Sequence, residues 1–214
     1  MRGAPDSVPL DLACSLIAAH ATPGLDVGEP LRALDVLAER CRDRSFDGVL
    51  AHLFGAGGLA GNSEDYYALD NSLLDRVLRR RLGIPITLSI VAMEVGRRVG
   101  VPIAGIGMPG HFLVRESRGD RFADPFNGGQ VLSEADCRAL FHRLHGESAR
   151  WSPRHLAPES RRAIVVRVLG NMKGIARQTG DLDTLRWVMR LRAAVPGLAD
   201  QERDEFRRMM STLN

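Results

Sequence analysis

Several patterns that mark particular protein classes are scarce or absent in this sequence. No apolar run approaches the ~20 residues that a membrane-spanning helix needs. The first residues, Met1 to Asp6, lack the apolar stretch of a secretory signal peptide. The three cysteines are odd in number and form no Cys-x-x-Cys pair, which argues against a disulfide framework or a zinc site. We therefore expect a cytoplasmic protein that does not associate with membranes.

Lysine is also scarce, because 28 of the 29 basic residues are arginine. Residues 158–214 hold 11 basic and 7 acidic residues, net +4, whereas the remainder of the chain carries net −1. This imbalance makes the basic tail a candidate surface for an acidic protein partner. Acidic residues are interspersed among the arginines and no aromatic platform accompanies them, so we do not expect nucleic-acid binding.

The remaining composition is that of a folded protein. Of the 214 residues, 44% are hydrophobic and 26% are charged, which excludes a disordered or fibrous chain. The length suffices for one core domain with a small helical appendage.

Apolar residues recur with the helical period over most of the first hundred residues. The expected stripes are Leu10, Ala13, Cys14 and Ile17; Leu31, Leu34, Ala38 and Cys41; Val49, Leu50, Leu53 and Phe54; Leu74, Val77, Leu78 and Leu82; and Leu88, Val91, Ala92, Val95 and Val99. Asn71 or Ser72 is expected to cap the fourth helix, which should end at Gly83. Pro85 suits the first turn of the fifth helix, and Gly100 should end it.

The pattern then changes to short strands, predicted at 103–107, 112–115 and 121–126. A four-residue loop from Glu116 to Gly119, with Gly119 free to adopt positive φ, would join the last two as a hairpin. The segment 127–157 contains glycine and proline and is expected to be a linker region. From Pro158 the chain should be helical again, with breaks at Gly180-Asp181 and Pro196-Gly197. Helices, a small antiparallel sheet and a helical hairpin together predict an α+β fold.

His111 and Asp124 are the first candidates for a chemical site, because His111 opens one predicted strand and Asp124 closes the next. The four-residue loop pairs Arg115 with Asp120, which places His111 opposite Asp124 at a Cβ separation of about 5 Å. A hydrogen bond between them would fix the imidazole tautomer and raise the basicity of the other ring nitrogen, as in a catalytic triad. A buried histidine with a purely structural role is an equally weighted alternative.

A His–Asp pair needs a nucleophile, usually a cysteine or serine at a helix N-terminus. The helix before the sheet begins Gly83-Ile84-Pro85-Ile86-Thr87 and contains no cysteine. Thr87 is the nearest hydroxyl and Ser89 lies two residues further on; for Thr87 we favour a hydrogen bond to nearby backbone. Cys14 and Cys41 lie on apolar stripes, and acidic neighbours should raise the pKa of Cys137, so none is expected to act as the nucleophile.

Motifs along residues 10–135 follow an order that resembles the transglutaminase-like superfamily, whose catalytic members have a papain-like Cys-His-Asp arrangement. The matching stretches are Gly61-Asn62, Tyr66-Tyr67, Asn71-Ser72-x-Leu74, Arg80 to Leu88, Gly100-Val101-Pro102, Pro109 to Val114 and Asp124 to Gly129. The chain is most similar to the SirB-type branch of bacterial proteins, in which a tetratricopeptide-like helical tail follows the transglutaminase-like domain. The tail resembles that branch in Asn171-Met172-Lys173 and Gly180-Asp181-Leu182.

The resemblance implies a transglutaminase-like domain over residues 1–135, a linker region over 136–157 and a tetratricopeptide-like tail over 158–214. One helix pair cannot bury its own apolar faces, so the tail should pack on the main domain or on a partner. The triad histidine falls on His111 and the aspartate on Asp124. The family's Gly-x-Cys corresponds to Gly83-Ile84-Pro85, so a proline occupies the position of the nucleophilic cysteine.

A polar cluster in the loop before the cleft-forming helices supplies candidate substrate-binding residues. Its members are Asn62, Tyr66, Asn71 and Ser72. They would line a groove beside His111 and hydrogen-bond a peptide or amide-like ligand. The alternative, which we favour, is that Asn71 caps a helix and Asn62 supports a turn.

Three functions remain open from the sequence. The leading hypothesis is a non-classical or inactive member of the family, a binding or regulatory module that presents a His–Asp cleft to a peptide or protein ligand. The second is a peptide or amide hydrolase or acyltransferase in which His111 and Asp124 activate Thr87, Ser89 or water. The third is a scaffold that uses the helical tail to contact an acidic protein. No motif indicates a cofactor, and His142 and His145 lack a third ligand for a metal.

Overall fold

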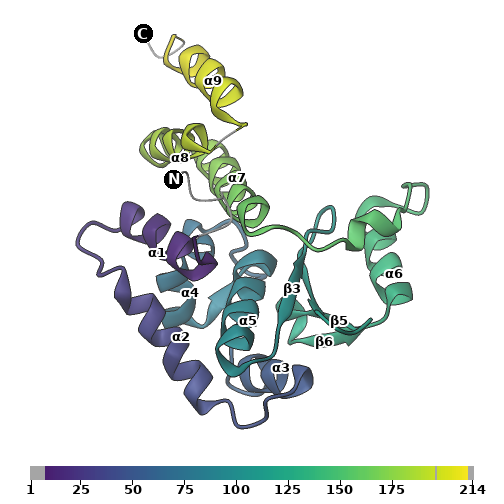
Figure 1. Ribbon diagram of the computed structural model, residues 1–214. Helices are drawn as coiled ribbons and strands as arrows, with labels where there is room; N and C mark the ends of the chain where they lie inside the picture. Colours follow the sequence, from purple (N-terminus) through teal and green to yellow (C-terminus); the bar gives the residue numbers. More distant parts are fainter. Residues whose placement is uncertain (1–7, 196, 212–214) are drawn as a thin grey trace, which may run out of the picture.

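The computed structural model describes residues 8–195 and 197–211, so the N-terminal residues Met1 to Asp6 and Pro196, both used above, lie outside it (Figure 1). The α-helices are α1 (Leu10–Ala21), α2 (Gly28–Arg40), α3 (Phe46–Phe54), α4 (Leu74–Arg80), α5 (Pro85–Val99), α6 (Glu134–His145), α7 (Arg161–Thr179), α8 (Leu182–Ala194) and α9 (Ala199–Ser211). Short 3-10 helices are η1 (Leu69–Ser72), η2 (Pro125–Asn127) and η3 (Pro153–Leu156). None of the described helices combines the length and apolar character needed to cross a membrane.

The helix α5 begins and ends where its sequence predicts. Pro85 is its first residue, and the Thr87 hydroxyl accepts a hydrogen bond from the Ile84 N–H (3.1 Å), which satisfies one of the free donors at the helix start. Gly100 terminates the helix with φ of 80°, a conformation that glycine adopts without steric cost.

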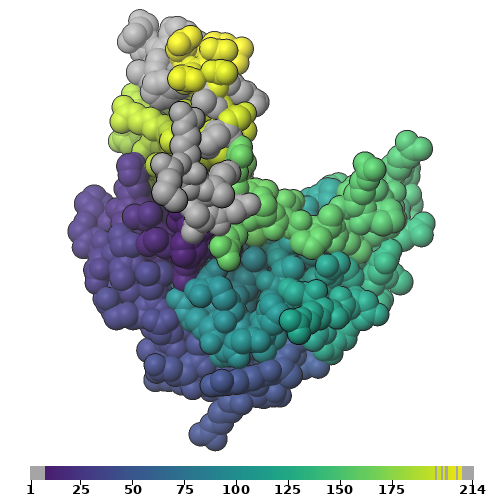
Figure 2. Space-filling model, viewed as in Figure 1, coloured from purple at the N-terminus to yellow at the C-terminus, as the bar shows by residue number. Residues whose placement is uncertain are grey.

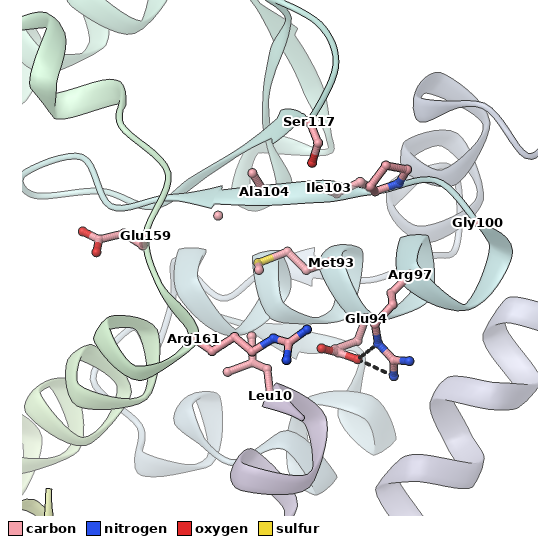
Figure 3. A pocket seen from close by; sticks show the side chains of 12 residues that line it. Leu10, Met93, Glu94, Arg97, Gly100, Ile103, Ala104, Ser117, Glu159 and Arg161 are labelled. Atoms are coloured by element: carbon pink, nitrogen blue, oxygen red, sulfur yellow. Dashed lines mark hydrogen bonds and ion pairs between the residues drawn. The ribbon is translucent and has the colours of Figure 1, made fainter. Parts of the chain in front are cut away.

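The C-terminal end of α5 is tied to its neighbours by charge. Arg97 donates to Glu94 within the helix (2.8 Å), and Arg98 donates to Asp11 of α1 (2.7 Å) and to Asp35 of α2 (2.7 Å). Burial raises the pKa of Glu94. Burial acts in the same direction on Asp11, but the hydrogen bonds from Arg98 and the Leu12 N–H, with the attraction of Arg98 and Arg97, together lower the pKa of Asp11. A cavity of about 440 Å³ opens beside this end, lined by Met93, Glu94 and Arg97 together with residues of β3 and the start of α7 (Figure 3).

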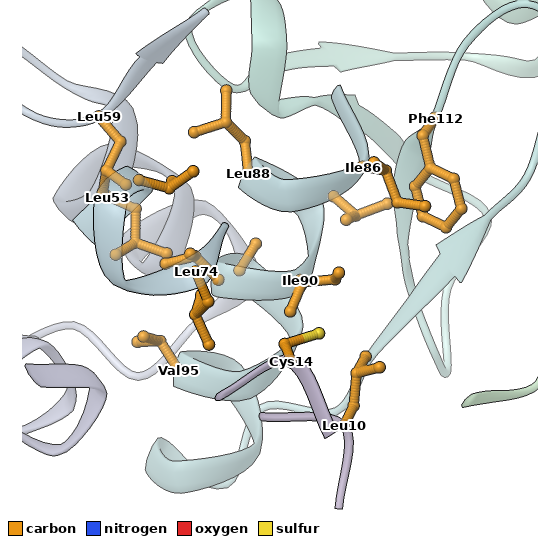
Figure 4. Close-up of a cluster of buried hydrophobic side chains, with 14 of the residues drawn as sticks. Leu10, Cys14, Leu53, Leu59, Leu74, Ile86, Leu88, Ile90, Val95 and Phe112 are labelled. Atoms are coloured by element: carbon orange, nitrogen blue, oxygen red, sulfur yellow. The ribbon is translucent and has the colours of Figure 1, made fainter. Parts of the chain in front are cut away.

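The middle of α5 is buried on nearly every side rather than along the single stripe that was predicted. Twelve of its fifteen residues are buried. Figure 4 shows Ile86 beside Phe112 and Leu88 on the other side of the helix. The helices α1, α2, α3 and α4 surround α5 on one side and the sheet covers the other (Figure 1), so both layers share one apolar core.

The main sheet is an antiparallel meander of four strands in the order β3, β4, β5, β6. The strands are β3 (Ile103–Ile106), β4 (Leu113–Glu116), β5 (Phe122–Asp124) and β6 (Gln130–Leu132). Three of them match predicted strands within three residues at each end, whereas β6 was not predicted. A separate pair of two-residue strands, β1 (Ala60–Gly61) and β2 (Leu82–Gly83), runs parallel.

The predicted register of the β4–β5 hairpin was wrong by two residues. The structure pairs Arg115 with Phe122 and Val114 with Ala123, so the continued register places Asp124 opposite Leu113 and not opposite His111. The loop is displaced by one residue, because the Glu116 N–H donates to the Arg121 carbonyl (3.2 Å), and Gly119 does not adopt the positive φ that was expected. A shift of two residues returns each side chain to the same face of a strand, so it does not separate His111 from Asp124.

The predicted boundaries of α4 also need correction. The helix ends at Arg80 and not at Gly83, because Arg81 takes the left-handed conformation and residues 82–83 form β2. Neither Asn71 nor Ser72 caps it. Its N-cap is Leu73, and no side chain bonds the free N–H groups there.

A helix stands where the sequence predicted a linker. Ser133 caps α6 by accepting a hydrogen bond from the Asp136 N–H (3.2 Å). The apolar side of α6 covers the face of the sheet that α5 leaves open, and together they form a second core cluster. Its residues are Ile106, Met108, Leu113, Phe122, Leu132, Cys137, Leu140, Phe141 and Leu156.

The helices α7 and α8 pack onto the main core. Ile164, Val168 and Met172 of α7 and Val188 of α8 belong to the same buried cluster as α5. The two helices meet at Gly180 (φ 71°), and Asp181 caps α8 by accepting from the Thr184 N–H (2.9 Å). This packing agrees with the expectation that a single helix pair must bury its apolar faces elsewhere.

The last helix, α9, is joined to α7 and α8 by ion pairs. Lys173 contacts Glu202 (2.7 Å) and Glu205 (2.7 Å), and Arg192 contacts Glu202 (2.6 Å). Part of the basic charge of the tail is therefore neutralised within the chain. Figure 2 shows α8 and α9 rising from one side of the molecule, away from α6.

The burial of α5 predicts a strong dependence of stability on its core side chains. Leu88→Ala removes a fully buried side chain, so we expect a loss of about 2–5 kcal/mol in the free energy of unfolding. Leu16→Ala on α1 is the matched control; this leucine is 52% exposed, and we expect a change within about 0.5 kcal/mol. Urea denaturation measures both, and equal losses in the two variants would contradict the central placement of α5.

Candidate functional site

The structure brings His111 and Asp124 into contact. Nε2 of His111 lies 2.9 Å from Oδ2 of Asp124, and both side chains are buried, at 9% and 2% exposed. Asp124 is the last residue of β5, but His111 precedes the first residue of β4 by two positions. The histidine therefore belongs to the loop that enters the strand, and the contact is diagonal across the hairpin and not directly cross-strand.

Asp124 is held as an acceptor by four hydrogen bonds. Oδ2 accepts from His111 and from Nδ2 of Asn127 (2.7 Å), and Oδ1 accepts from the main-chain N–H groups of Phe126 (3.0 Å) and Asn127 (3.3 Å). Burial alone would raise the pKa of this carboxyl, but the hydrogen bonds from His111 and Asn127 and the attraction of His111 lower it below its usual value. The group therefore stays ionised at neutral pH.

Asn127 was not among the predicted site residues. The signal was present in Asp124-Pro125-Phe126-Asn127, because an aspartate before a proline commonly accepts hydrogen bonds from the next residues of a turn. Its amide supports the same oxygen that contacts His111, so it orients the aspartate toward the ring.

The hydrogen bond to Asp124 fixes which tautomer His111 adopts when its ring is neutral. An ionised carboxylate can only accept, so in the neutral ring Nε2 carries the proton and Nδ1 the lone pair. Nδ1 has no hydrogen-bond partner among the described residues, and it is not among the polar atoms that are both buried and unpaired. It is therefore not sealed from solvent, and its lone pair can accept a hydrogen bond from a ligand.

The N-terminus of α5 lies beside this pair. The strand β2, directly before α5, pairs with β1. Gly61 of β1 packs so closely against Phe126 that a side-chain Cβ at this position would come within 2.5 Å of the Phe126 carbonyl oxygen. The Phe126 ring in turn meets the His111 ring edge-on, at a centroid distance of 6.2 Å. The helix α5 also packs against η2, so Pro85 and the His–Asp pair occupy the same part of the molecule.

No hydroxyl at the start of α5 is available as a nucleophile in this arrangement. Thr87 is 3% exposed, and its hydroxyl lies 2.7 Å from the Asn71 carbonyl, to which it donates, and also accepts from the Ile84 N–H. This geometry matches the backbone-bonding role that we favoured. Ser89 is fully buried and its hydroxyl lacks a hydrogen-bond partner among the described residues.

The three cysteines are buried and free. Burial raises the pKa of Cys14 to about 12, and burial with the nearby acids Asp136 and Asp124 raises that of Cys137 to about 12. Burial also raises the pKa of Cys41. All three remain protonated at neutral pH, so none provides a thiolate.

The polar cluster divides into buried supports and one partly exposed ring. Asn62 donates to Oδ1 of Asn71 (3.0 Å), and Asn71 donates to the carbonyls of Asp65 (2.7 Å) and Tyr66 (3.2 Å). Asn62, Asn71 and Ser72 are buried, at 6%, 0% and 3% exposed. Tyr66 is half-buried and packs edge-on against Phe126 (5.9 Å), so it is the member placed best to meet a ligand beside His111.

The cavity beside the C-terminal end of α5 is separate from the His–Asp pair. Neither His111 nor Asp124 lines the 440 Å³ cavity in Figure 3, which lies at the opposite end of α5. Among the residues that the structure describes, no three His, Cys, Asp or Glu side chains gather as metal ligands would.

Residues 29–170 match the family described as "Transglutaminase-like superfamily". Because the match covers well over half of the chain, the protein belongs to the transglutaminase-like superfamily. The match extends through α6 and into α7, beyond the boundary at residue 135 that the sequence motifs suggested.

Bacterial relatives carry the name UPF0162 protein. One from Xylella fastidiosa is 38% identical over 162 residues, which cover 73% of this chain and 58% of that protein. One from Pseudomonas aeruginosa is 32% identical over 196 residues, covering 87% and 72%. F-box only protein 21 of Mus musculus is 29% identical over 130 residues, covering 56% of this chain and 20% of that protein. No solved structure matches the chain significantly.

The support that Asn127 gives to Asp124 predicts a pH-dependent stability. Asn127→Ala removes a 2.7 Å donor to an ionised carboxylate, so we expect a loss of about 1.5–3 kcal/mol at pH 7 and a rise in the pKa of Asp124. The pKa of Asp124 is lower in the folded state than in the unfolded state, so its ionised form stabilises the fold at every pH above the unfolded-state pKa. This contribution is lost as the pH falls through the folded-state pKa. The loss should therefore be full at pH 7, shrink as the pH falls through the acidic range, and be smallest below the lowered pKa of Asp124, which lies under the ordinary value of 3.8.

Urea denaturation across this pH range and ¹³C NMR titration of the Asp124 carboxyl measure the two effects. Asn171→Ala on α7 is the control, because that amide is not among the donors to Asp124. A loss independent of pH, with an unchanged Asp124 titration, would contradict this account.

Proposed function

We propose that the protein is a non-catalytic member of its superfamily, a binding or regulatory module that holds a peptide or protein ligand against His111. The observation that carries the proposal is the presence of Pro85 as the first residue of α5, beside a complete His111–Asp124 pair. Proline has no atom that can attack a carbonyl, so a covalent acyl intermediate cannot form at this position.

The pair remains suited to recognition. The exposed lone pair of Nδ1 can accept the N–H of a peptide group, and the Asp124 carboxylate keeps the ring in the tautomer that this requires. Phe126 packs edge-on against the ring, and Tyr66 packs edge-on against Phe126, so aromatic surface continues away from the imidazole. A backbone amide beside aromatic rings is the chemistry of an extended peptide, which supports a peptide or protein ligand over a small polar metabolite.

A hydrolytic function is the second candidate, and the open Nδ1 is the observation that favours it. In that function Nδ1 would take a proton from water while the oxygen of that water attacks the carbonyl carbon of an amide or ester. The imidazolium would then return the proton to the leaving amine or alcohol as the C–N or C–O bond breaks. The step needs no side-chain nucleophile. The covalent variants through Thr87 or Ser89 have less support, because one hydroxyl is committed to backbone and the other is fully buried.

We further propose that α7 and α8 form the tetratricopeptide-like pair of a SirB-type protein. Two helices joined by the short turn at Gly180 and packed along each other are consistent with this assignment. The third function, a scaffold for an acidic partner, has less support, because Glu202 and Glu205 already neutralise Lys173 and Arg192.

The proposal predicts no His111-dependent turnover. Purified protein and His111→Ala should show equal, background rates on a panel of amide and ester substrates, because no nucleophile stands beside the imidazole. N-acetylated, C-amidated tripeptides should instead shift the NMR signal of the His111 ring and leave that of His20 on α1 unchanged. Robust turnover that disappears in His111→Ala would replace the binding module by a hydrolase, and Thr87→Val and Ser89→Ala would then separate a covalent route from a water route.

Restoring the missing thiol tests the assignment of Pro85. In Pro85→Cys, the introduced thiol should react with iodoacetamide at pH 6 at least about tenfold faster than an ordinary cysteine, because the imidazole and the helix N-terminus both favour a thiolate. Pro85→Cys combined with His111→Ala should lose this advantage. Mass spectrometry of the modified peptide follows the rate. Equal rates in the two variants would show that residue 85 does not face His111.

A further inference from the structure

The loop that carries His111 is held by side chains from the C-terminal third of the chain. Nη2 of Arg167, on α7, donates to the main-chain carbonyls of Met108 (2.8 Å) and His111 (2.6 Å). On the other side of the loop, Nε2 of His145, on α6, lies 3.0 Å from the Pro109 carbonyl. Three of the four carbonyls in residues 108–111 therefore meet donors outside the loop.

The loop has little support of its own. β4 begins at Leu113, so the ladder of the sheet does not fix the backbone of His111. Within the loop, the His111 N–H donates to the Met108 carbonyl (3.1 Å), and Gly110 turns the chain with φ of 73°. A single internal hydrogen bond and a glycine leave the direction of the imidazole to be set by outside contacts.

Arg167 is placed as a support and not as a surface charge. Its guanidinium lies over the Phe112 ring, 5.3 Å from the centroid. None of the ion pairs between described residues includes Arg167, although Glu159 is near enough to act on its pKa, which burial lowers. Removing a cation from water without a paired carboxylate is costly. For Arg167 the cost is offset by the hydrogen bonds from its guanidinium to the loop carbonyls and by the cation–π contact with Phe112.

We propose that Arg167 is a positioning residue for His111, and that α7 is by this contact a part of the site. The arginine fixes the backbone on both ends of the 108–111 turn, and His145 fixes the middle. The imidazole is then directed at Asp124 with Nδ1 outward. The proposal deepens the binding function proposed above and rests on it for its biological use, but the geometry it describes can be tested without any ligand.

Arg167→Met tests the proposal by removing the donors while retaining an apolar side chain over Phe112. The matched control is Arg192→Met, because Arg192 also lies in the tail and donates to a main-chain carbonyl, that of Val166 (2.9 Å), without touching the loop. The readout is the Nε2–H proton of His111 in NMR, whose exchange with solvent reports its hydrogen bond to Asp124. We expect exchange to accelerate about tenfold or more in Arg167→Met and to change little in Arg192→Met.

Arg167→Lys should recover most of the protection, because an ammonium group can also donate to two carbonyls. His145→Ala should accelerate exchange to a smaller extent, since it removes one contact. Unchanged exchange in Arg167→Met, or equal acceleration in Arg167→Met and Arg192→Met, would overturn the proposal. If Arg167→Met does not fold, Arg167→Lys and His145→Ala decide the question with the same readout.

A second readout separates this proposal from the proposed function. Alkylation of the thiol in Pro85→Cys should slow when Arg167→Met is added and stay unchanged when Arg192→Met is added. If the thiol in Pro85→Cys shows no dependence on His111, the assignment of residue 85 fails, whereas the exchange of the His111 proton still reports on the role of Arg167.

Discussion

Burial of α5 on nearly every side is the constraint on which the rest of the structure depends. A helix that is covered by α1 to α4 on one side and by the sheet on the other cannot shift or rotate without opening both layers of one core. The helix is thereby held against η2, the turn that directly follows Asp124. The proline that begins the helix shares one part of the molecule with the His–Asp pair because of packing that involves the whole domain.

The pair itself contributes orientation more than stability. Burying a carboxylate is costly, and Asp124 recovers the cost through four donors, two of them main-chain N–H groups of the turn that follows it. Apolar residues of similar volume could fill this space with no loss of stability. What they could not supply is an imidazole whose tautomer is fixed and whose second nitrogen is open to solvent.

Much of this arrangement could be predicted from local sequence signals. Pro85 and Gly100 mark the ends of α5, and strand-like stretches bounded by turn residues indicate β3, β4 and β5. The predicted meeting of His111 and Asp124 is present although its register was wrong, because an error of two residues preserves the face of a strand. The predicted hydrogen bond of Thr87 to nearby backbone is also present, since a first-turn hydroxyl has few other partners.

The missed features depend on contacts between distant segments. The apolar residues of α6 can be assigned to a core only once it is known that they pack against the second face of the sheet. Arg167 lies more than fifty residues after the carbonyls that it bonds, and nothing near it in the sequence points to them. Ser72 and Asn71 resemble helix caps, but the turn at Leu73 takes that position and leaves Asn71 to hold the preceding loop.

These long-range contacts change which part of the chain counts as the site. The pair and the start of α5 lie within residues 85–124, yet the backbone that presents the imidazole is held from α6 and α7. The family match, which continues to residue 170, includes both supports. The helix α7 packs on the core and also bonds the histidine loop. Under the function proposed above, a partner would alter the direction of the imidazole only by binding better to a state in which α7 is displaced, because that displacement removes the Arg167 contacts from the loop.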